Sequence, residues 1–160
     1  MNDDYRFEYQ YDANGNLTLK KQEQKTSGVW NQENKLECRW NPRNRLTRAV
    51  SYGSGVNNEG SVDYQYCLSC DGALSVRMQY AGDVGAASGA LTSKRRYEYD
   101  GLNLLRIDEL CDANGNGTID EGEETWRKVE VNTHKPGSLG TLLAKRVYSY
   151  PTAGNRCVSN

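Results

Sequence analysis

The sequence has little of what several functional classes require. No apolar run approaches the roughly eighteen residues that span a bilayer, and the first residues lack the apolar region of a secretion signal. Its 20 lysines and arginines are scattered among 21 aspartates and glutamates, which is unlike a nucleic-acid footprint. We expect no membrane span and no nucleic-acid partner, and we expect any export signal to lie outside this chain.

Signatures of catalysis are also scarce. The single histidine, His134, lies in a stretch typical of a loop, and no nucleophile motif is present. No acidic pair sits in a context that would separate two pKa values; Asp108 and Glu109 are most simply interpreted as solvated charges at a strand end. We expect no enzyme, although the two carboxylates of a glycosidase need not be close in sequence.

Cysteine occurs five times, an odd number, so at least one thiol is left out of intramolecular disulfides. Cys67 and Cys70 have the spacing of half a zinc site, but no second ligand pair accompanies them. Buried or disulfide-bonded cysteines are therefore the favoured interpretation. The five are Cys38, Cys67, Cys70, Cys111 and Cys157.

The sequence is rich in aromatic residues with a polar end. It has 11 tyrosines and three tryptophans against one phenylalanine, in a chain that is only 36% hydrophobic. Such residues suit half-buried positions on a sheet, where one end of the side chain packs and the other meets water. We therefore expect thin β layers rather than a thick core.

A short frame of alternating residues around a turn recurs along the chain. Glu8–Lys20 alternates on both sides of Asn14-Gly15, which is among the strongest short-range signals for a hairpin. The frame is repeated at Trp40–Thr47 and Tyr97–Arg106, more weakly at Trp30–Glu37, and in degenerate form from Tyr64 to Ser75.

Repetition of short hairpins predicts an all-β array, in which each unit buries its apolar face only against its neighbours. We expect one region over residues 1–160 with units near 5–30, 30–52, 62–80, 95–131 and 142–160, and surface loops at 52–61 and 81–90. The residues expected to shape the repeat are Tyr11, Asp12, Gly15, Leu17, Trp40, Leu46, Tyr99, Asp100 and Gly101.

The stretch Tyr11–Thr18 resembles the defining motif of the YD-repeat, or Rhs-repeat, family, and Tyr99–Leu105 and Trp40–Thr47 resemble variants of it. The family contains large secreted or surface proteins, among them polymorphic toxins and adhesion proteins. The resemblance implies a β-ribbon that twists and spirals into a shell, in which this chain would be a piece of wall. It also implies an extracellular or cell-surface location and neighbouring repeats as partners.

The pentapeptide Asp-Ala-Asn-Gly-Asn at residues 12–16 returns at 112–116, but there it continues differently. Residues 112–123 match the twelve-residue calcium loop of an EF-hand, with glycine at the sixth position and isoleucine at the eighth. The alternative is a longer polar hairpin loop without metal. The expected Ca²⁺ ligands are Asp112, Asn114, Asn116, the carbonyl of Thr118, Asp120 and Glu123.

The flanks of this loop differ from an EF-hand. Residues 104–110 and 125–131 predict strands rather than paired helices, so we expect an EF-hand-like loop set between strands. Without helices to open, a sensor-type switch is not expected. Three carboxylates and two amides suit a structural site of modest affinity, matched to millimolar extracellular calcium.

Two functions follow from these patterns. The first is a calcium-stabilised structural segment that pairs with neighbouring repeats or with copies of itself through its terminal strands, Tyr5–Tyr11 and 144–150, the latter followed by Pro151. The alternative is an adhesion module that binds a glycan or a protein partner through exposed tyrosine and tryptophan. Both arrangements place aromatic rows on a sheet.

Overall fold

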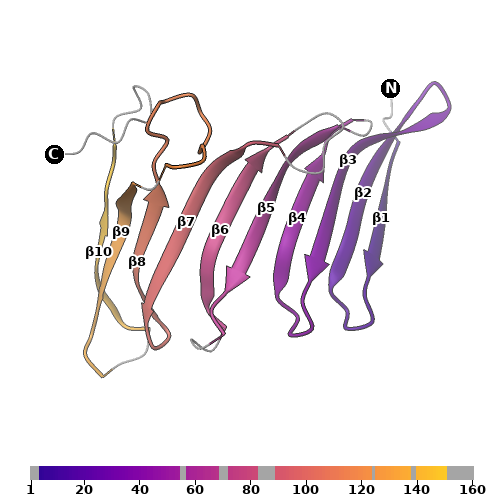
Figure 1. The fold of residues 1–160 in the computed structure, drawn as a ribbon. Coiled ribbons are helices and arrows are strands. Elements are labelled where there is room, and N and C mark those ends of the chain that lie inside the picture. The colour runs from indigo at the N-terminus through magenta and orange to yellow at the C-terminus, as the bar shows by residue number, and fades with distance from the viewer. Residues whose placement is uncertain are drawn as a thin grey trace. The chain divides into compact units, whose positions relative to one another are not determined.

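The computed structural model describes residues 4–54, 57–68, 72–82, 89–123, 125–137 and 140–150. Its regular elements are ten β-strands, each hydrogen-bonded to the next in chain order. Figure 1 labels these strands. This confirms the all-β fold class. The strands are β1 (Tyr5–Tyr11), β2 (Leu17–Thr26), β3 (Val29–Trp40), β4 (Leu46–Tyr52), β5 (Asn58–Tyr66), β6 (Leu74–Ala81), β7 (Leu91–Asp100), β8 (Asn103–Leu110), β9 (Trp126–His134) and β10 (Leu142–Val147).

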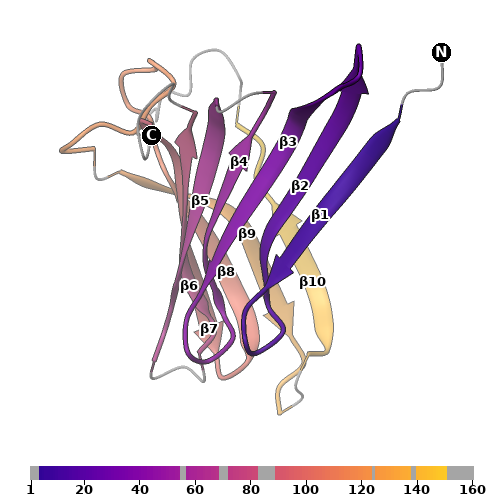
Figure 2. The same ribbon diagram turned by 90° about the vertical axis from the view of Figure 1, so that its right-hand side faces the viewer.

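The chain forms two compact units. The first unit comprises Met1–Asp63 and Gln79–Ala90, and the second comprises Tyr64–Met78 and Leu91–Asn160. In the first, β1 to β5 pair antiparallel in succession, and Figure 2 shows β1 to β4 side by side with β1 at the open edge. In the second, β7 to β10 pair antiparallel in the same successive way.

The core is thin, as the composition predicted. Among the described residues only Val50, Leu110 and Cys111 are buried hydrophobic residues. More of the buried residues are polar or charged, so cross-strand pairs and hydrogen bonds contribute a large share of the stability. These polar residues are Glu23, Asn58, Ser61, Asp108, Asp112 and Asn132.

The first hairpin, β1–β2, is closed by the turn that its sequence predicts. The Asp12 carboxylate accepts hydrogen bonds from the backbone N–H of Asn14 and of Asn16, both at 2.9 Å. Gly15 takes φ = 82°, a left-handed conformation that glycine adopts readily. The predicted hairpin is therefore confirmed, with the Asp12 side chain capping the turn and, of the pair Asn14-Gly15, only Gly15 at positive φ.

The β3–β4 turn repeats this geometry with different residues. The Asn41 side chain accepts hydrogen bonds from the backbone N–H of Arg43 and of Arg45, both at 3.0 Å. Asn44 takes the left-handed position with φ = 57°. The predicted repeat at Trp40–Thr47 is therefore confirmed, because its turn forms the same two side-chain hydrogen bonds as the first turn.

The aromatic residue before each turn lies opposite the leucine after it. In the hairpins β1–β2, β3–β4 and β7–β8, the strand register shifts immediately before the aromatic residue. The shift brings the aromatic residue opposite the leucine on the other side of the turn. The third turn places Gly101 at φ = 56° after Asp100. The opposed pairs are Tyr11 with Leu17, Trp40 with Leu46, and Tyr99 with Leu104.

One proposed copy of the repeat is wrong. Trp30–Glu37 lies inside β3 and contains no turn. The chain reverses earlier, where Ser27 (φ = 52°) and Gly28 (φ = 82°) both adopt left-handed conformations. A two-residue turn with two positive φ angles matches the twist of a hairpin, so this pair, and not the later frame, separates the strands.

Part of the expected loop at residues 52–61 is also strand. β5 begins at Asn58, and Gly60 lies within the strand. A Cβ added to Gly60 would meet the carbonyl oxygen of Tyr80 at 2.9 Å, so glycine allows a close backbone approach there. Of the second expected loop, residues 83–88 lie outside the described residues.

Three smaller expectations need adjustment. His134 ends β9 instead of lying in a loop. The last described strand is Leu142–Val147, shifted from the expected 144–150, and Pro151 lies outside the described residues. In the degenerate copy, β5 ends at Tyr66 and β6 begins at Leu74, and residues 69–71 between them are not described.

Candidate metal site

The loop at residues 112–123 joins β8 to β9 and is the orange loop beyond the end of β8 in Figure 1. Its base is closed by a hydrogen bond from the backbone N–H of Cys111 to the carbonyl of Thr125, at 2.9 Å. Strands flank it on both sides, which confirms the β context that the sequence predicted.

Asp112 organises the beginning of the loop. Its side chain is buried, with 3% of the residue exposed, and its two carboxylate oxygens accept hydrogen bonds from Gly115 N–H (2.6 Å) and Gly117 N–H (2.7 Å). Both glycines have positive φ, of 75° and 89°. The carboxylate therefore fixes a tight reversal that residues with a Cβ would strain.

Asp120 lies where the middle of the loop converges. Its carboxylate accepts hydrogen bonds from the side-chain amides of Asn114 (2.7 Å) and Asn116 (2.8 Å) and from the Thr118 hydroxyl (3.2 Å). The hydrogen bond from Asn114, followed by that from Asn116, lowers the pKa of Asp120 from its ordinary value. Residues at alternate loop positions thus meet at one exposed carboxylate.

Glu123 ties the end of the loop to its beginning. One carboxylate oxygen accepts a hydrogen bond from Ala113 N–H at 2.8 Å, and the other accepts from Asp120 N–H at 2.9 Å. A further hydrogen bond, from Ile119 N–H to the Leu91 carbonyl at 2.6 Å, attaches the loop to the first residue of β7. The loop is therefore held at its base, across its middle and to a neighbouring strand.

The loop oxygens are occupied by N–H and O–H donors in this structure. Among the described residues, no group of three or more acidic, histidine or cysteine side chains is placed to hold a metal ion. The side chains predicted as ligands nevertheless all form hydrogen bonds within the loop, and their oxygens are the hard donors that calcium prefers. The oxygen ligands that the loop offers therefore suit calcium, but in this structure they are hydrogen-bonded to other groups of the same loop.

The first copy of the pentapeptide forms a different structure. Asp12 accepts from the N–H groups two and four residues later, whereas Asp112 accepts from those three and five residues later. The Asn16 side chain then donates to Asp12 (2.9 Å) and to Asn44 of the next turn (3.0 Å), and β2 begins at once. Only one carboxylate is present, so the first copy lacks the ligand set of the second.

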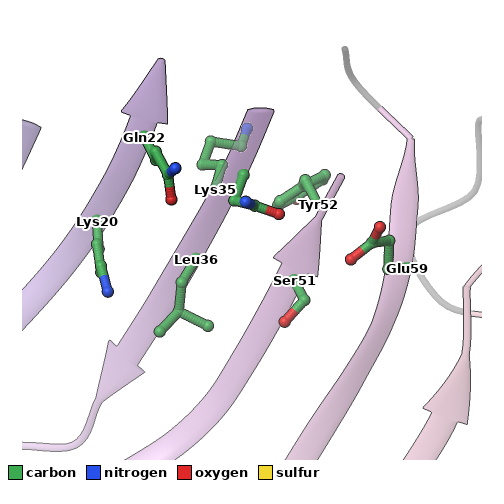
Figure 3. Close-up of a pocket in the computed structure, with 8 residues that line it drawn as sticks. Lys20, Gln22, Lys35, Leu36, Ser51, Tyr52 and Glu59 are labelled. Atoms are coloured by element: carbon green, nitrogen blue, oxygen red, sulfur yellow. The ribbon is translucent and has the colours of Figure 1, made fainter. Parts of the chain in front are cut away.

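A second feature, which the sequence did not suggest, is a shallow depression of about 290 Å³ on the first unit. Figure 3 shows side chains from β2 to β5 around it, with hydrogen-bond donors and acceptors beside one leucine and one tyrosine. The Lys35 ammonium lies 3.9 Å from the centre of the Tyr52 ring. The lining residues are Lys20, Gln22, Asn34, Lys35, Leu36, Ser51, Tyr52 and Glu59.

Of the three cysteines that the structure describes, two follow the disulfide interpretation; Cys70 and Cys157 lie outside the described residues. Cys67 and Cys111 are both disulfide-bonded, and Cys38 is a free thiol, as the odd count required. Burial raises the pKa of the Cys38 thiol. Because Cys67 is disulfide-bonded, it is not available as a zinc ligand.

No protein-family model matches the chain, and no curated protein shows significant similarity to it. Within the described ranges, no helix is long and apolar enough to pass through a bilayer.

Proposed function

We propose that this chain is a structural segment of a secreted or cell-surface protein of the YD-repeat type. In this role its hairpins form a ribbon, calcium stabilises the loop at residues 112–123, and the outer strands pair with further hairpins in a longer chain or in another copy. The observation that carries the proposal is the recurrence of one turn geometry, with the same two side-chain hydrogen bonds, after Tyr11 and after Trp40.

Adjacent turns also contact each other, as an array requires. Asn16 of the first turn donates to Asn44 of the second, and the Trp40 ring N–H donates to the Leu17 carbonyl at 2.7 Å. The first hairpin and the second therefore support each other through side chains at the repeat positions. Such nearest-neighbour support is what stabilises repeat proteins.

Calcium would be held by the side chains that now bind one another. Asp112, Asp120 and Glu123 supply negative charge, and Asn114 and Asn116 carry amide oxygens at the alternate positions. Calcium bound there would supply positive charge to offset the repulsion among three carboxylates within twelve residues. The free energy of unfolding would then rise with the logarithm of the ratio of calcium concentration to Kd.

An extracellular location is consistent with the sulfur chemistry. Disulfides persist in oxidising compartments and are rare in the cytosol, and both Cys67 and Cys111 are disulfide-bonded. Extracellular calcium at millimolar concentration also suits a site of modest affinity. The observed disulfides and the affinity expected of this calcium site favour the same environment.

A calcium titration of thermal unfolding tests the proposal. At a calcium concentration 100 times Kd, binding to the native state alone adds about 2.7 kcal/mol to the free energy of unfolding. The double variant Asp120→Asn, Glu123→Gln should lose this gain, because it keeps the shape of the side chains but removes two charges. Glu121→Gln, an exposed residue of the same loop outside the expected ligand set, should keep it.

Two results would contradict this part of the proposal. One is a melting temperature that does not change with calcium in the native protein. The other is an equal rise in the double variant, which would place the ion elsewhere. Magnesium at the same concentration serves as the ionic-strength control.

The depression on the first unit favours the alternative function of glycan binding. Its mixed lining offers donors and acceptors to hydroxyl groups, and Tyr52 offers an apolar ring face. A glycan array separates the alternatives: binding that is lost in Gln22→Ala and Ser51→Ala would support an adhesion module. The absence of binding across the array would leave the structural role as the proposal.

A further inference from the structure

The outer edge of β1 carries an unusual combination of features. All seven of its residues are exposed, and Tyr5, Phe7, Tyr9 and Tyr11 are 48%, 53%, 49% and 61% exposed. The strand contains no proline, which would remove a hydrogen-bond donor from the edge.

The hydrogen-bonding groups of this edge can be assigned. Lys25 N–H donates to the Asp4 carbonyl, so the backbone groups of Asp4 point toward β2. Because successive residues of an antiparallel strand point their backbone groups to opposite sides, those of Tyr5, Phe7 and Tyr9 point outward. The aromatic residues therefore also supply the free N–H and C=O groups.

The side chains of β1 divide by face. Tyr5, Phe7 and Tyr9 project from one face of the sheet, and Arg6 and Glu8 project from the other. Arg6 pairs with Glu23 at 2.5 Å and lies over the ring of Trp30, at 4.7 Å from its centre, while its side chain remains 52% exposed. Glu8 accepts a hydrogen bond only from its neighbour Gln10 among the described residues, so its carboxylate can take further donors.

We propose that β1 pairs antiparallel with β1 of a second copy, about a two-fold axis that passes through Phe7. In this register Phe7 lies opposite Phe7 and Tyr5 lies opposite Tyr9. Arg6 of each copy lies opposite Glu8 of the other. The proposal rests on the structural role given above and specifies which edge associates and in which register.

The alternative registers are weaker. The axis at Phe7 joins three outward-pointing residues of each copy by about six main-chain hydrogen bonds, with aromatic pairs on one face and two opposite-charge pairs on the other. An axis at Glu8 gives about four such bonds and places Glu8 directly against Glu8. Side-chain charge therefore selects the first register.

β10 does not offer the same self-complementarity. It is exposed along its length, but it carries Lys145 and Arg146 and no acidic residue. No register of β10 against itself forms an ion pair within the strand. The two-fold pairing of β1 is isologous, so it closes at a dimer and does not continue into a filament.

Sedimentation velocity over a range of protein concentrations tests the edge. The expected result is a reversible dimer whose Kd rises about tenfold in Glu8→Arg, since two attractive contacts become repulsive. Arg146→Glu, a charge reversal on the exposed strand β10, should leave Kd unchanged. A monomer at all concentrations, a filament, or equal effects of the two variants would overturn the proposal.

Disulfide trapping tests the register and does not depend on the charge variants. In a Cys38→Ser background, Phe7→Cys should form a covalent dimer in a glutathione buffer, because residues opposite each other in a hydrogen-bonded pair have Cα atoms about 5.5 Å apart. Tyr9→Cys faces Tyr5 in this register, so it should not crosslink to itself. Equal trapping at both positions would exclude an axis at Phe7.

The same samples separate this inference from the proposed function. The change of melting temperature with calcium is measured on each variant. The loop at residues 112–123 belongs to the second unit and β1 to the first, so a substitution in β1 should leave that change intact. A monomer that still responds to calcium would refute the dimer and leave the structural role standing. A dimer without a calcium response would support the pairing of β1 and contradict the calcium site of the proposed function.

Discussion

Replacing Asp112 by alanine tests whether the two copies of Asp-Ala-Asn-Gly-Asn have different roles, the first as a turn and the second as the start of a calcium-binding loop. The Asp112 carboxylate is buried and accepts two backbone hydrogen bonds, so Asp112→Ala leaves two N–H groups without their partner. A hydrogen bond to a charged group contributes about 1.5–3 kcal/mol, but water reaches the exposed glycines and replaces part of this. We therefore expect a loss of about 2–3 kcal/mol in calcium-free buffer.

For a chain of this length, such a loss lowers the melting temperature by about 4–12 °C, at about 2–4 °C per kcal/mol. The assay is thermal unfolding in EDTA followed by circular dichroism and tryptophan fluorescence, then repeated with calcium. Asp112→Asn retains one acceptor oxygen and should lie between alanine and the native protein. Calcium should stabilise neither variant as much as it stabilises the native protein, because both lack the first carboxylate of the loop.

Asp12→Ala is the matched control, since Asp12 opens the same pentapeptide and also accepts two backbone hydrogen bonds. It should destabilise the first hairpin and leave the increase in melting temperature with calcium unchanged. Two results would refute the reasoning. One is a full calcium response in Asp112→Ala, and the other is a calcium response lost in Asp12→Ala.

Two further predictions concern the first unit. Gly15→Val should lower the free energy of unfolding, measured by urea denaturation, by about 1–2 kcal/mol. Backbone strain alone would cause this loss, because φ is 82° and an added Cβ would meet nothing within 4 Å. Gly15→Asn should cost less, since Asn44 occupies the equivalent position in the second turn, and equal losses in the two variants would exclude strain as the cause. The hydrogen bond from Arg6, followed by that from Lys21, lowers the pKa of Glu23 to about 2, so the stability due to this carboxylate is present above its ordinary pKa of 4.5 and is lost as the pH falls toward 2. Melting temperatures measured from pH 6 to pH 2 should therefore fall less steeply for Glu23→Gln than for the native protein, and parallel curves would show that the pair contributes nothing.

The hairpins could be predicted from sequence where the information is local. Asn14-Gly15 and Asn41 specify their turns through residues within five positions, so the structure agrees with the pattern there. Ser27-Gly28 is a local signal of the same kind, but the prediction rested only on the repeat frame at Trp30–Glu37, which lies inside β3. A short repeat pattern matches a sequence by chance more easily than a pair of residues that favour positive φ.

Glycine in a strand could not be predicted in the same way. In the sequence Gly60 suggested a loop, but it lies in β5. Glycine fits there because the carbonyl oxygen of Tyr80 approaches too closely for a Cβ. That approach depends on a strand twenty residues away, so no local pattern contains it. The orientation of the Asn114 and Asn116 amides toward Asp120 is equally invisible in a spacing of alternate residues.

The succession of strands in chain order has a consequence for the rate of folding. In the first unit β1 to β4 pair only with strands adjacent in sequence, so each new pairing closes a short loop and loses little chain entropy. Proteins whose contacts are local in sequence fold faster than those that join distant segments. During synthesis, β2 can close on β1 and β3 on β2 as soon as each leaves the ribosome, and the growing sheet needs no later residue to complete its earlier hairpins.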